Sequence, residues 1–384
     1  MPHLSGRGSA ATMKDIMPAW YEIANAAEIP SPALLVYPDR IEENLRRMVA
    51  VAGSAERLRP HVKTHKMPEV IRLCLAHGIG KFKAATIAEA EMTAAAGAAD
   101  VLLAYPVVGP AARRLVELAR RFPQTRFRTV VDSDVGIDDL AQAAAAAGTR
   151  IDTLLDLDVG MHRTGVAPGP EALRLARRIA ESPAIAFGGL HAYDGHLHDA
   201  DHRRLVEQVG AAFAPVWQLR DELLAAGIPV PLVVAAGTPT TPILAARGDV
   251  EVGAGTTVLW DFGQPTTSPD LDFLNAAVLL ARVVSHPAPG RLCLDLGHKA
   301  VASEMPHPRI RIFGLEDATF PMHSEEHLVV ETPRAAELPV GTVVYALPRH
   351  VCPTVALHEQ AVVVRDGRAV DRWHVAARTR IISV

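Results

Sequence analysis

The sequence predicts an α/β protein in which a (β/α)8 TIM-type barrel is followed by a C-terminal antiparallel β-domain. Three observations support this fold class. Strand-like and helix-like stretches alternate from Pro32 onward, helical periodicity nearly disappears after about residue 270, and the composition is that of a globular chain. Of the 384 residues, 49% are hydrophobic and 21% are charged. An open, doubly wound sheet is the alternative for the first part.

Eight short, apolar and β-branched runs are the expected barrel strands. They cover residues 33–37, 58–63, 81–85, 101–105, 127–132, 153–158, 186–193 and 232–236. The stretches between them are rich in Ala, Leu and Arg with helical spacing, for example 41–52 and 109–121. Strands that alternate with helices predict a parallel sheet, and eight such units over about 230 residues match a closed barrel.

The last third of the chain has a different pattern. Seven strand candidates, separated by turns rich in Gly and Pro, lie at 278–286, 292–296, 310–313, 327–331, 343–347, 361–364 and 373–376. This pattern is typical of an antiparallel β-domain. We therefore expect an N-terminal segment (1–30) that packs on the β-domain, a barrel (31–268) and the β-domain itself (269–384).

Charge and cysteine content exclude several functional classes. The chain has 39 Lys and Arg against 43 Asp and Glu, without a basic block, so we expect no nucleic-acid partner. Three cysteines are too few, and odd in number, for a secreted disulfide scaffold. No apolar run approaches the roughly 18 residues of a membrane helix, and no signal-like core begins the chain. These features predict a cytoplasmic protein without a membrane partner.

Polar residues follow several of the predicted barrel strands. They lie in the segments 59–66, 156–165, 191–199, 237–240 and 253–257. Reactive groups of a (β/α)8 barrel gather at the carboxyl ends of its strands. We therefore expect these five segments to converge on one mouth of the barrel.

Lys63 is the most informative residue among them. Strand alternation places Arg59, His61 and Lys63 on one face. A lysine that points into the barrel mouth is partly desolvated, which favours the neutral amine that attacks an aldehyde to form a Schiff base. The alternative is an ordinary solvated lysine at the end of a strand.

Two Gly-Thr pairs, Gly237-Thr238 and Gly255-Thr256, resemble anion cradles. Glycine allows close backbone approach, and the N–H and hydroxyl groups that follow can donate to phosphate oxygens. Barrels often bind phosphate after their last strands. A single Gly-Thr pair is usually only a turn, so the prediction depends on finding two of them near the last strand.

Two further pairs carry possible metal ligands. His196 with His198, and His350 with Cys352, each place two ligand groups on one face of an extended segment. The alternatives are a polar loop for the two histidines and a small buried hydrophobe for the cysteine.

The motif RPHVKTHK at 59–66 is similar to the lysine motif of the D-threonine aldolase and D-serine dehydratase family. The resemblance extends over nearly the whole chain and includes residues 31–36, 158–165, 237–240 and 348–354. Members of this family are pyridoxal-phosphate enzymes with an alanine racemase-like fold, a (β/α)8 barrel followed by a β-domain. The resemblance also implies a homodimer in which the β-domain of one subunit helps to close the site of the other.

The resemblance implies a role for each matching residue. The cofactor site would comprise Lys63, His61, Arg163, Tyr193, Gly237, Thr238, Gly255 and Thr256. Lys63 would form the Schiff base, the Gly-Thr pairs would hold the phosphate, and Tyr193 or Arg163 would lie near the pyridine ring. His350 and Cys352 would bind a divalent metal near the substrate's β-hydroxyl. A thiolate favours Zn²⁺, while Mn²⁺ or Mg²⁺ remain alternatives.

The implied substrate is a D-amino acid with a β-hydroxyl group, and two reactions are open. Cleavage of the Cα–Cβ bond gives glycine and an aldehyde and needs a base for the hydroxyl proton, for which His196 and His198 are candidates. Cleavage of the Cα–H bond by Lys63, with loss of hydroxide, gives a 2-oxo acid and ammonia. The overall resemblance favours the aldolase. Cys352 favours the dehydratase, because the aldolases place an aspartate at this position.

Two further alternatives share the fold. A racemase needs a second acid–base residue, and Tyr345 is the only tyrosine after Tyr193. A non-enzymatic pyridoxal-phosphate carrier consists of the barrel alone, so the β-domain argues against it.

Overall fold

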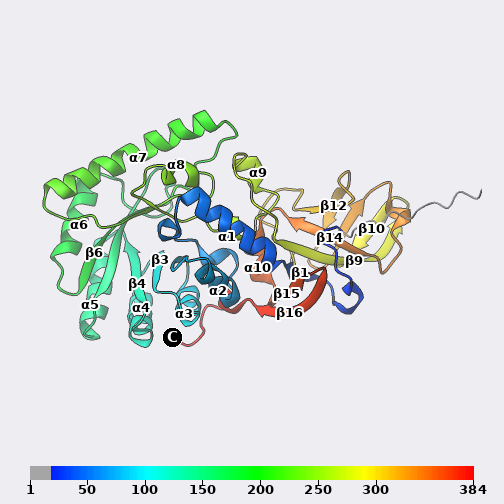
Figure 1. Ribbon diagram of the computed structural model, residues 1–384, viewed down its shortest axis with the longest axis horizontal. Helices are drawn as coiled ribbons and strands as arrows, with labels where there is room; N and C mark the ends of the chain where they lie inside the picture. Colours follow the sequence, from blue (N-terminus) through cyan, green and yellow to red (C-terminus); the bar gives the residue numbers. More distant parts are fainter. Residues whose placement is uncertain (1–18) are drawn as a thin grey trace, which may run out of the picture.

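The computed structural model describes residues 19–384, so most of the expected N-terminal segment lies outside the described residues. Figure 1 shows an elongated molecule with the barrel at one end and the β-domain at the other. The strands form one seven-stranded sheet and one nine-stranded sheet. A parallel barrel followed by an antiparallel sheet confirms the predicted fold class.

The helices are α1 (Pro38–Ala52), α2 (Pro68–Ala76), α3 (Ile87–Ala95), α4 (Pro110–Arg121), α5 (Asp134–Ala146), α6 (Pro170–Glu181), α7 (His202–Ala225), α8 (Thr241–Ala245), α9 (Gln264–Thr267) and α10 (Val351–Leu357). The strands are β1 (Ala33–Val36), β2 (Lys81–Ala84), β3 (Asp100–Pro106), β4 (Arg126–Val131), β5 (Ile151–Leu157), β6 (Ile185–Ala192), β7 (Val233–Ala235), β8 (Glu251–Val252), β9 (Ala277–Ala288), β10 (Arg291–Leu294), β11 (Ile310–Ile312), β12 (Thr319–His323), β13 (Leu328–Glu331), β14 (Val343–Pro348), β15 (Gln360–Arg365) and β16 (Arg368–His374).

The barrel consists of β2 to β8, paired in chain order, and one irregular segment that joins the two edges. Leu58 bridges to Val252 of β8, and His61 bridges to Lys83 of β2, both in parallel orientation. The amide of Lys83 donates to the Pro60 carbonyl at 2.9 Å. Segment 58–61 therefore takes the place of the eighth barrel strand.

Two of the predicted barrel strands need correction. The run at 33–37 does form a strand, β1, but β1 pairs with β9 and β15 of the C-terminal sheet. All four of its residues are buried, and an apolar run that is buried on both faces does not reveal which sheet it joins. The run at 58–63 is strand-like only as far as His61 and then turns into the 3₁₀ helix Val62–Thr64. The two-residue strand β8 was too short to be recognised.

The β-domain sheet has the order β12-β13-β10-β9-β1-β15-β16, and β14 pairs with β9 and β11. The sequence missed β12 and also α10, so His350 and Cys352 do not lie on an extended segment as predicted. His350 precedes α10, and Cys352 is its second residue. The helix begins there because Asp261 accepts a hydrogen bond from the Val351 amide at 2.9 Å, a tertiary partner that local sequence does not reveal.

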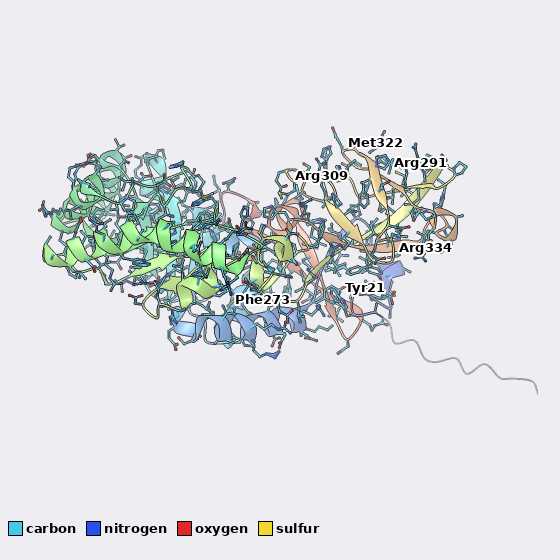
Figure 2. The ribbon with its side chains drawn as sticks, turned by 90° about the horizontal axis from the view of Figure 1, so that it is seen from above. Tyr21, Phe273, Arg291, Arg309, Met322 and Arg334 are labelled. Carbon is cyan, nitrogen blue, oxygen red and sulfur yellow. The ribbon has the colours of Figure 1, made fainter. Side chains whose placement is uncertain are left out.

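Residues 19–30 contact the β-domain. The Tyr21 ring stacks on Phe313 with 3.8 Å between centroids, and the Ile23 amide donates to the Tyr345 hydroxyl at 3.2 Å. Figure 2 shows Tyr21 on the β-domain side of the molecule and Phe273 near its junction with the barrel. The domain limits at residues 31, 268 and 269 stay a prediction. Within residues 19–384, no helix has both the length and the apolar character that crossing a membrane requires.

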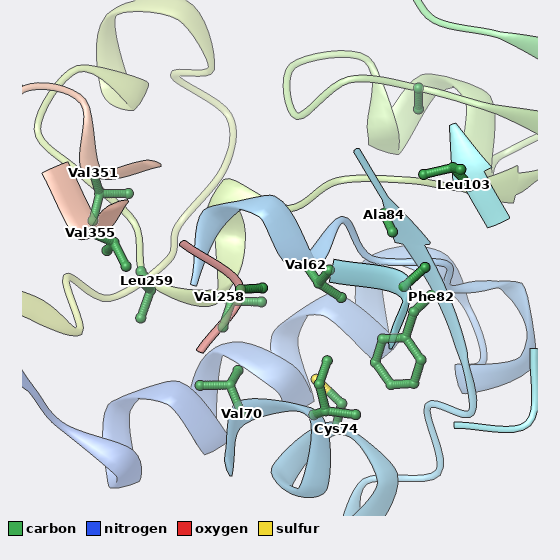
Figure 3. Packing of buried hydrophobic residues seen from close by; sticks show 14 of the residues in the cluster. Val62, Val70, Cys74, Phe82, Ala84, Leu103, Val258, Leu259, Val351 and Val355 are labelled. Atoms are coloured by element: carbon green, nitrogen blue, oxygen red, sulfur yellow. The ribbon is translucent and has the colours of Figure 1, made fainter. Parts of the chain in front are cut away.

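One apolar cluster extends from the barrel wall to α10. Val62, which precedes Lys63, is 1% exposed and shares this cluster with Phe82 and Val258 (Figure 3). Val351 and Cys74 belong to the same cluster. The turn that carries Lys63 is therefore anchored in the core, and Cys74 is a small buried hydrophobe.

Candidate active site

A cavity of about 280 Å³ opens at the carboxyl ends of the barrel strands. It is lined by His61, Lys63, Thr64, Tyr193, Gly195, His198, Gly237, Thr238, Pro239, Gly253, Ala254, Gly255, Thr256, Gln264, Thr267, His350 and Cys352. Four of the five segments expected to converge do so. The remaining lining residues come from α9 (Gln264 and Thr267) and from the start of α10 (its N-cap His350 and Cys352). The segment 156–165 contributes no lining residue.

Lys63 reaches this cavity from a tightly held turn. Its amide donates to Nδ1 of His61 at 3.4 Å, and His61 is buried. Burial, followed by the charges of Lys63 and Lys83, holds the pKa of His61 well below its ordinary value, so this imidazole is neutral. A Cβ on Gly255 would stand 2.7 Å from the His61 carbonyl oxygen. The Gly255 loop thus packs directly on the lysine turn, which requires glycine there.

The two Gly-Thr pairs lie on adjacent loops, because β7 and β8 are neighbours and the Gly253 amide donates to the Ala235 carbonyl at 3.0 Å. Within the described residues, the amides of Thr238, Gly255 and Thr256 donate to no protein acceptor. The buried hydroxyl of Thr257 also has no partner, but Thr257 does not line this cavity. Unpaired donors on two converging loops fit a phosphate group.

Tyr193 and Arg163 were both candidates for contact with a cofactor ring. Tyr193 lines the cavity, and Gly195 leaves room for its ring, since a Cβ on Gly195 would stand 2.5 Å from the ring atoms. Arg163 is exposed and does not line the cavity, although its guanidinium carbon lies 4.7 Å from the centroid of the Tyr193 ring. Arg163 therefore touches a residue of the cavity wall but does not itself line the cavity.

The two histidines after β6 lie in different places. His198 is exposed and lines the cavity. His196 does not line it and packs against Gly160, where a Cβ would stand 3.1 Å from Nε2 of His196. The Nδ1 atom of His196 is buried without a partner. Of the two candidate bases, only His198 faces the cavity.

His350 and Cys352 lie at the β-domain side of the cavity. Nδ1 of His350 is 2.6 Å from Oε1 of Glu304, and the Cys352 thiol donates to the Thr64 hydroxyl at 3.3 Å. Burial alone would lower the pKa of His350, but a hydrogen bond with Cys352 and the nearby Glu304 raise it to about 9. Burial would raise the pKa of Cys352, but His350 and then Lys63 bring it below its ordinary value. The pair provides one nitrogen and one sulfur donor. Among residues 19–384, no group of three or more His, Cys, Asp or Glu residues could hold a metal.

Several polar residues beneath the cavity received no role from the sequence, although His191, Asp194 and Asp156 lie in segments that were expected to reach the mouth. Nδ1 of His191 is 2.7 Å from Asp156, while its Nε2 is buried without a partner. Lys83 and Asp194 are also buried. Lys83 lies two residues after Lys81 on one strand, and His191 lies on a strand whose other residues are apolar or glycine. A polar residue within such a barrel strand is the signal that could have identified them.

Matches to family models cover both parts of the chain. The "Alanine racemase, N-terminal domain" model matches residues 36–258, and the "Putative serine dehydratase domain" model matches residues 276–364. The first match spans more than half of the chain, and the unmatched residues 259–275 lie between β8 and β9.

Similar proteins include aldolases and a dehydratase. A D-threonine aldolase of an Arthrobacter species is 34% identical over 92% of this chain and 93% of its own. The crystal structure of D-threonine aldolase from Filomicrobium marinum superposes with a TM-score of 0.86 at 30% identity, covering 94% of this chain and 98% of that one. A D-threo-3-hydroxyaspartate dehydratase of Delftia sp. HT23 is 27% identical over 90% of this chain and 97% of its own, and a Cys-to-Ala variant of it has been solved in a metal-free form.

These matches confirm the family expected from the lysine motif. The chain belongs to the pyridoxal-phosphate-dependent family that joins an alanine racemase-type barrel to a serine dehydratase-type domain and that includes D-threonine aldolase.

Proposed function

We propose that this protein is a pyridoxal-phosphate-dependent, metal-assisted lyase that cleaves D-β-hydroxy-α-amino acids to glycine and an aldehyde. One observation carries the proposal: a single cavity brings together Lys63, two loops with unpaired amides, and the His350–Cys352 pair. The lysine supplies an amine that can react with an aldehyde, and the loops supply N–H groups that can hold a phosphate. The histidine and the cysteine supply donor atoms for a divalent metal. The 34% identity to a D-threonine aldolase supports the choice of reaction.

The residues of the cavity fit pyridoxal phosphate. Lys63 would hold its aldehyde carbon, the loops at Gly237-Thr238 and Gly255-Thr256 would hold its phosphate, and Tyr193 would lie against its ring. When bound, the cofactor supplies an electron sink for negative charge at Cα of the substrate. His61, kept neutral by burial, fixes the turn that aims Lys63.

His350 and Cys352 would hold the divalent metal, and their nitrogen and sulfur donors favour Zn²⁺ over Mn²⁺ or Mg²⁺. Glu304 would orient the His350 ring by accepting a hydrogen bond from its Nδ1. Carboxylates commonly hold metal-binding histidines in this way. When present, a divalent metal lowers the pKa of a hydroxyl group, which eases removal of the proton from the substrate's β-oxygen. His198, at the open side of the cavity, would accept this proton.

Dehydration is the second candidate reaction. Cys352 and the 27% identity to a D-threo-3-hydroxyaspartate dehydratase favour it. In that reaction Lys63 would remove the Cα proton. His350 and Cys352 would again hold the metal and in this way assist loss of the hydroxide. The racemase alternative receives less support, because the hydroxyl of Tyr345 is engaged by the Ile23 amide. A homodimer and a cytoplasmic location complete the proposal, supported by the family resemblance and by three free cysteines.

The test is a product assay. The purified protein would be incubated with pyridoxal phosphate, Zn²⁺ or Mn²⁺, and in turn D-threonine, D-phenylserine, D-serine and D-3-hydroxyaspartate. We expect glycine and the matching aldehyde in equal amounts, little product from L-threonine, and loss of activity after EDTA treatment that added metal restores. Ammonia and a 2-oxo acid would establish the dehydratase instead. Equal conversion between D- and L-amino acids would establish a racemase.

A further inference from the structure

Lys83 is a buried lysine directly beneath the cavity. It lies on β2 and is 2% exposed, and its Nζ would stand 2.4 Å from a Cβ on Gly253, a residue of the cavity wall. The same Nζ lies 5.5 Å from the centroid of the Tyr193 ring. It forms no hydrogen bond with any residue in the described part of the chain. An amine in this position has lost most of its solvation without gaining a hydrogen-bond partner from the protein.

Asp194 is a buried carboxylate beside the same cavity. It is fully buried, and its Oδ1 accepts a hydrogen bond from the Gly237 amide at 2.5 Å. Its other oxygen, Oδ2, is buried without a partner. Gly237 immediately precedes Thr238, whose amide is free for a phosphate. The carboxylate therefore fixes one of the two loops of the phosphate cradle.

This arrangement creates a conflict of charges. A phosphate that binds at Thr238 would bring negative charge next to a carboxylate that water cannot screen. Lys83 is the buried amine whose charge acts on Asp194. Burial and then the charge of Lys63 bring the pKa of Lys83 down to about 7, and the charge of Asp194 opposes this shift. Burial raises the pKa of Asp194. The Thr240 side chain and the hydrogen bond from the Gly237 amide oppose this rise, and the charge of Lys83 adds to their effect.

We propose that Lys83 and Asp194 are the charge-balancing pair of the phosphate site. Asp194 holds the Gly237 loop in position, and Lys83 offsets its negative charge so that a phosphate group can bind beside it. Both are positioning residues for the cofactor. This inference rests on the proposed binding of pyridoxal phosphate, and it adds two residues that the lysine motif and the Gly-Thr pairs do not include.

The test compares pyridoxal phosphate with pyridoxal, which lacks the phosphate. Dissociation constants would be measured by absorbance titration of the apoprotein for wild type, Lys83→Met, Asp194→Asn and the double variant. In Lys83→Met, the buried carboxylate must repel the phosphate or first take up a proton. We expect affinity for pyridoxal phosphate to fall about tenfold or more, while affinity for pyridoxal changes less than about twofold. The double variant should recover most of the lost affinity, because Asp194→Asn removes the unbalanced charge.

Lys81→Met is the matched control. Lys81 lies on the same face of β2, but its ammonium pairs with Glu251 at the opposite end of the barrel. Its loss should leave both dissociation constants unchanged. An equal loss of affinity for both ligands in Lys83→Met, or a double variant no better than Lys83→Met, would overturn the inference and indicate a packing role only.

A further measurement covers the case in which Lys83→Met does not fold. Inorganic phosphate would compete with pyridoxal phosphate for wild type and Asp194→Asn, and we expect tighter phosphate binding in the variant. Weaker or unchanged binding would overturn the inference. If wild type binds pyridoxal phosphate no better than pyridoxal, the phosphate cradle of the proposed function fails together with this inference. If wild type prefers pyridoxal phosphate but Lys83→Met keeps the preference, only the inference fails.

Discussion

The amino and carboxyl ends of the barrel both bury charged side chains, but they leave these charges in different states. At the amino end, Arg59 is fully buried, and its Nε donates to Glu251 at 2.7 Å and its Nη1 to Asp100 at 2.6 Å. Only its third guanidinium nitrogen, Nη2, has no partner among the described residues. Asp100 also pairs with Arg128, which in turn pairs with Asp152. The network therefore contains one residue from each of four strands: Asp100 of β3, Arg128 of β4, Asp152 of β5 and Glu251 of β8. Through Arg59 it links these strands to segment 58–61.

At the carboxyl end, the buried polar groups are incompletely paired. Within residues 19–384, Nε2 of His191 and Oδ2 of Asp194 are buried without a partner. The side chain of Lys83, which is 2% exposed, forms no hydrogen bond there. An unpaired buried group costs stability, whereas a paired one is tolerated. The difference indicates that the amino end is arranged for stability and the carboxyl end for a ligand that supplies the missing partners.

Replacing Lys63 tests the carboxyl end with the largest expected effect. Lys63→Ala removes the amine that would hold the cofactor. It leaves Val62 buried and keeps the hydrogen bond from the amide of residue 63 to Nδ1 of His61. We expect turnover to fall about a thousandfold or more, because the reaction loses its covalent attachment point. The visible absorbance of the bound cofactor should disappear, while the midpoint of urea unfolding stays close to that of wild type. An unchanged spectrum would move the attachment point to another lysine, and Lys83 would be the first to examine.

Replacing Arg59 tests the amino end. Arg59→Met leaves the negative charges of Asp100 and Glu251 less balanced by positive charge inside the barrel. We therefore expect the free energy of unfolding, measured in urea, to fall by about 3–5 kcal/mol. Arg126→Met is the control at the same end of the barrel: Arg126 pairs with Asp152 but is 60% exposed, so its loss should cost about 1 kcal/mol or less. A large loss of cofactor affinity in folded Arg59→Met would contradict the division of roles between the two ends.

The same network predicts a dependence on pH. Burial would raise the pKa of Asp100, but Arg59 and then Arg128 bring it below the ordinary value of an aspartate. A folded-state pKa below the unfolded one stabilises the protein above the unfolded pKa, and this stabilisation is lost as the pH falls through the folded value. Without Arg59, the folded-state pKa of Asp100 lies closer to its unfolded value. When the pH is lowered from above the unfolded pKa of Asp100 to its folded pKa, Arg59→Met should therefore lose less free energy of unfolding than wild type.

Sequence reasoning succeeded where local pattern determines structure and failed where tertiary partners do. The alternation of strands and helices predicted the barrel. The RPHVKTHK motif pointed to Lys63, which lines the cavity and whose role stays a proposal. By contrast, β1 joined the other sheet, because a four-residue apolar run carries no information about its neighbours. The helix that presents Cys352 depends on Asp261, which lies 90 residues earlier in the chain. Both errors arise from contacts between distant segments.

The candidate site shows the same limit. Its glycines and threonines were predicted from their spacing, but only the fold shows that His198 enters the cavity and His196 does not. Lys83 was passed over, and Asp194 was included only as part of segment 191–199, because each gains its character from burial among other charges.

The two histidines allow the smallest and most selective test of the carboxyl end. His198→Gln removes an imidazole that lines the cavity without disturbing a buried contact, because His198 is exposed. A general base contributes about a hundredfold or more to rate, so kcat for cleavage of D-threonine should fall by about that factor while cofactor affinity stays the same.

His196→Gln is the matched control, because the residue lies two positions away and packs against Gly160 instead of the cavity. We expect its kcat to stay within about threefold of wild type and any effect to be seen in the melting temperature, since truncating a contact outside the reacting cavity changes packing before chemistry. The opposite result, a loss of kcat in His196→Gln with normal turnover in His198→Gln, would mean that the loop after β6 rearranges when substrate binds. The unpaired Nδ1 of His196 would then belong with Lys83 and His191 among the groups that a ligand completes.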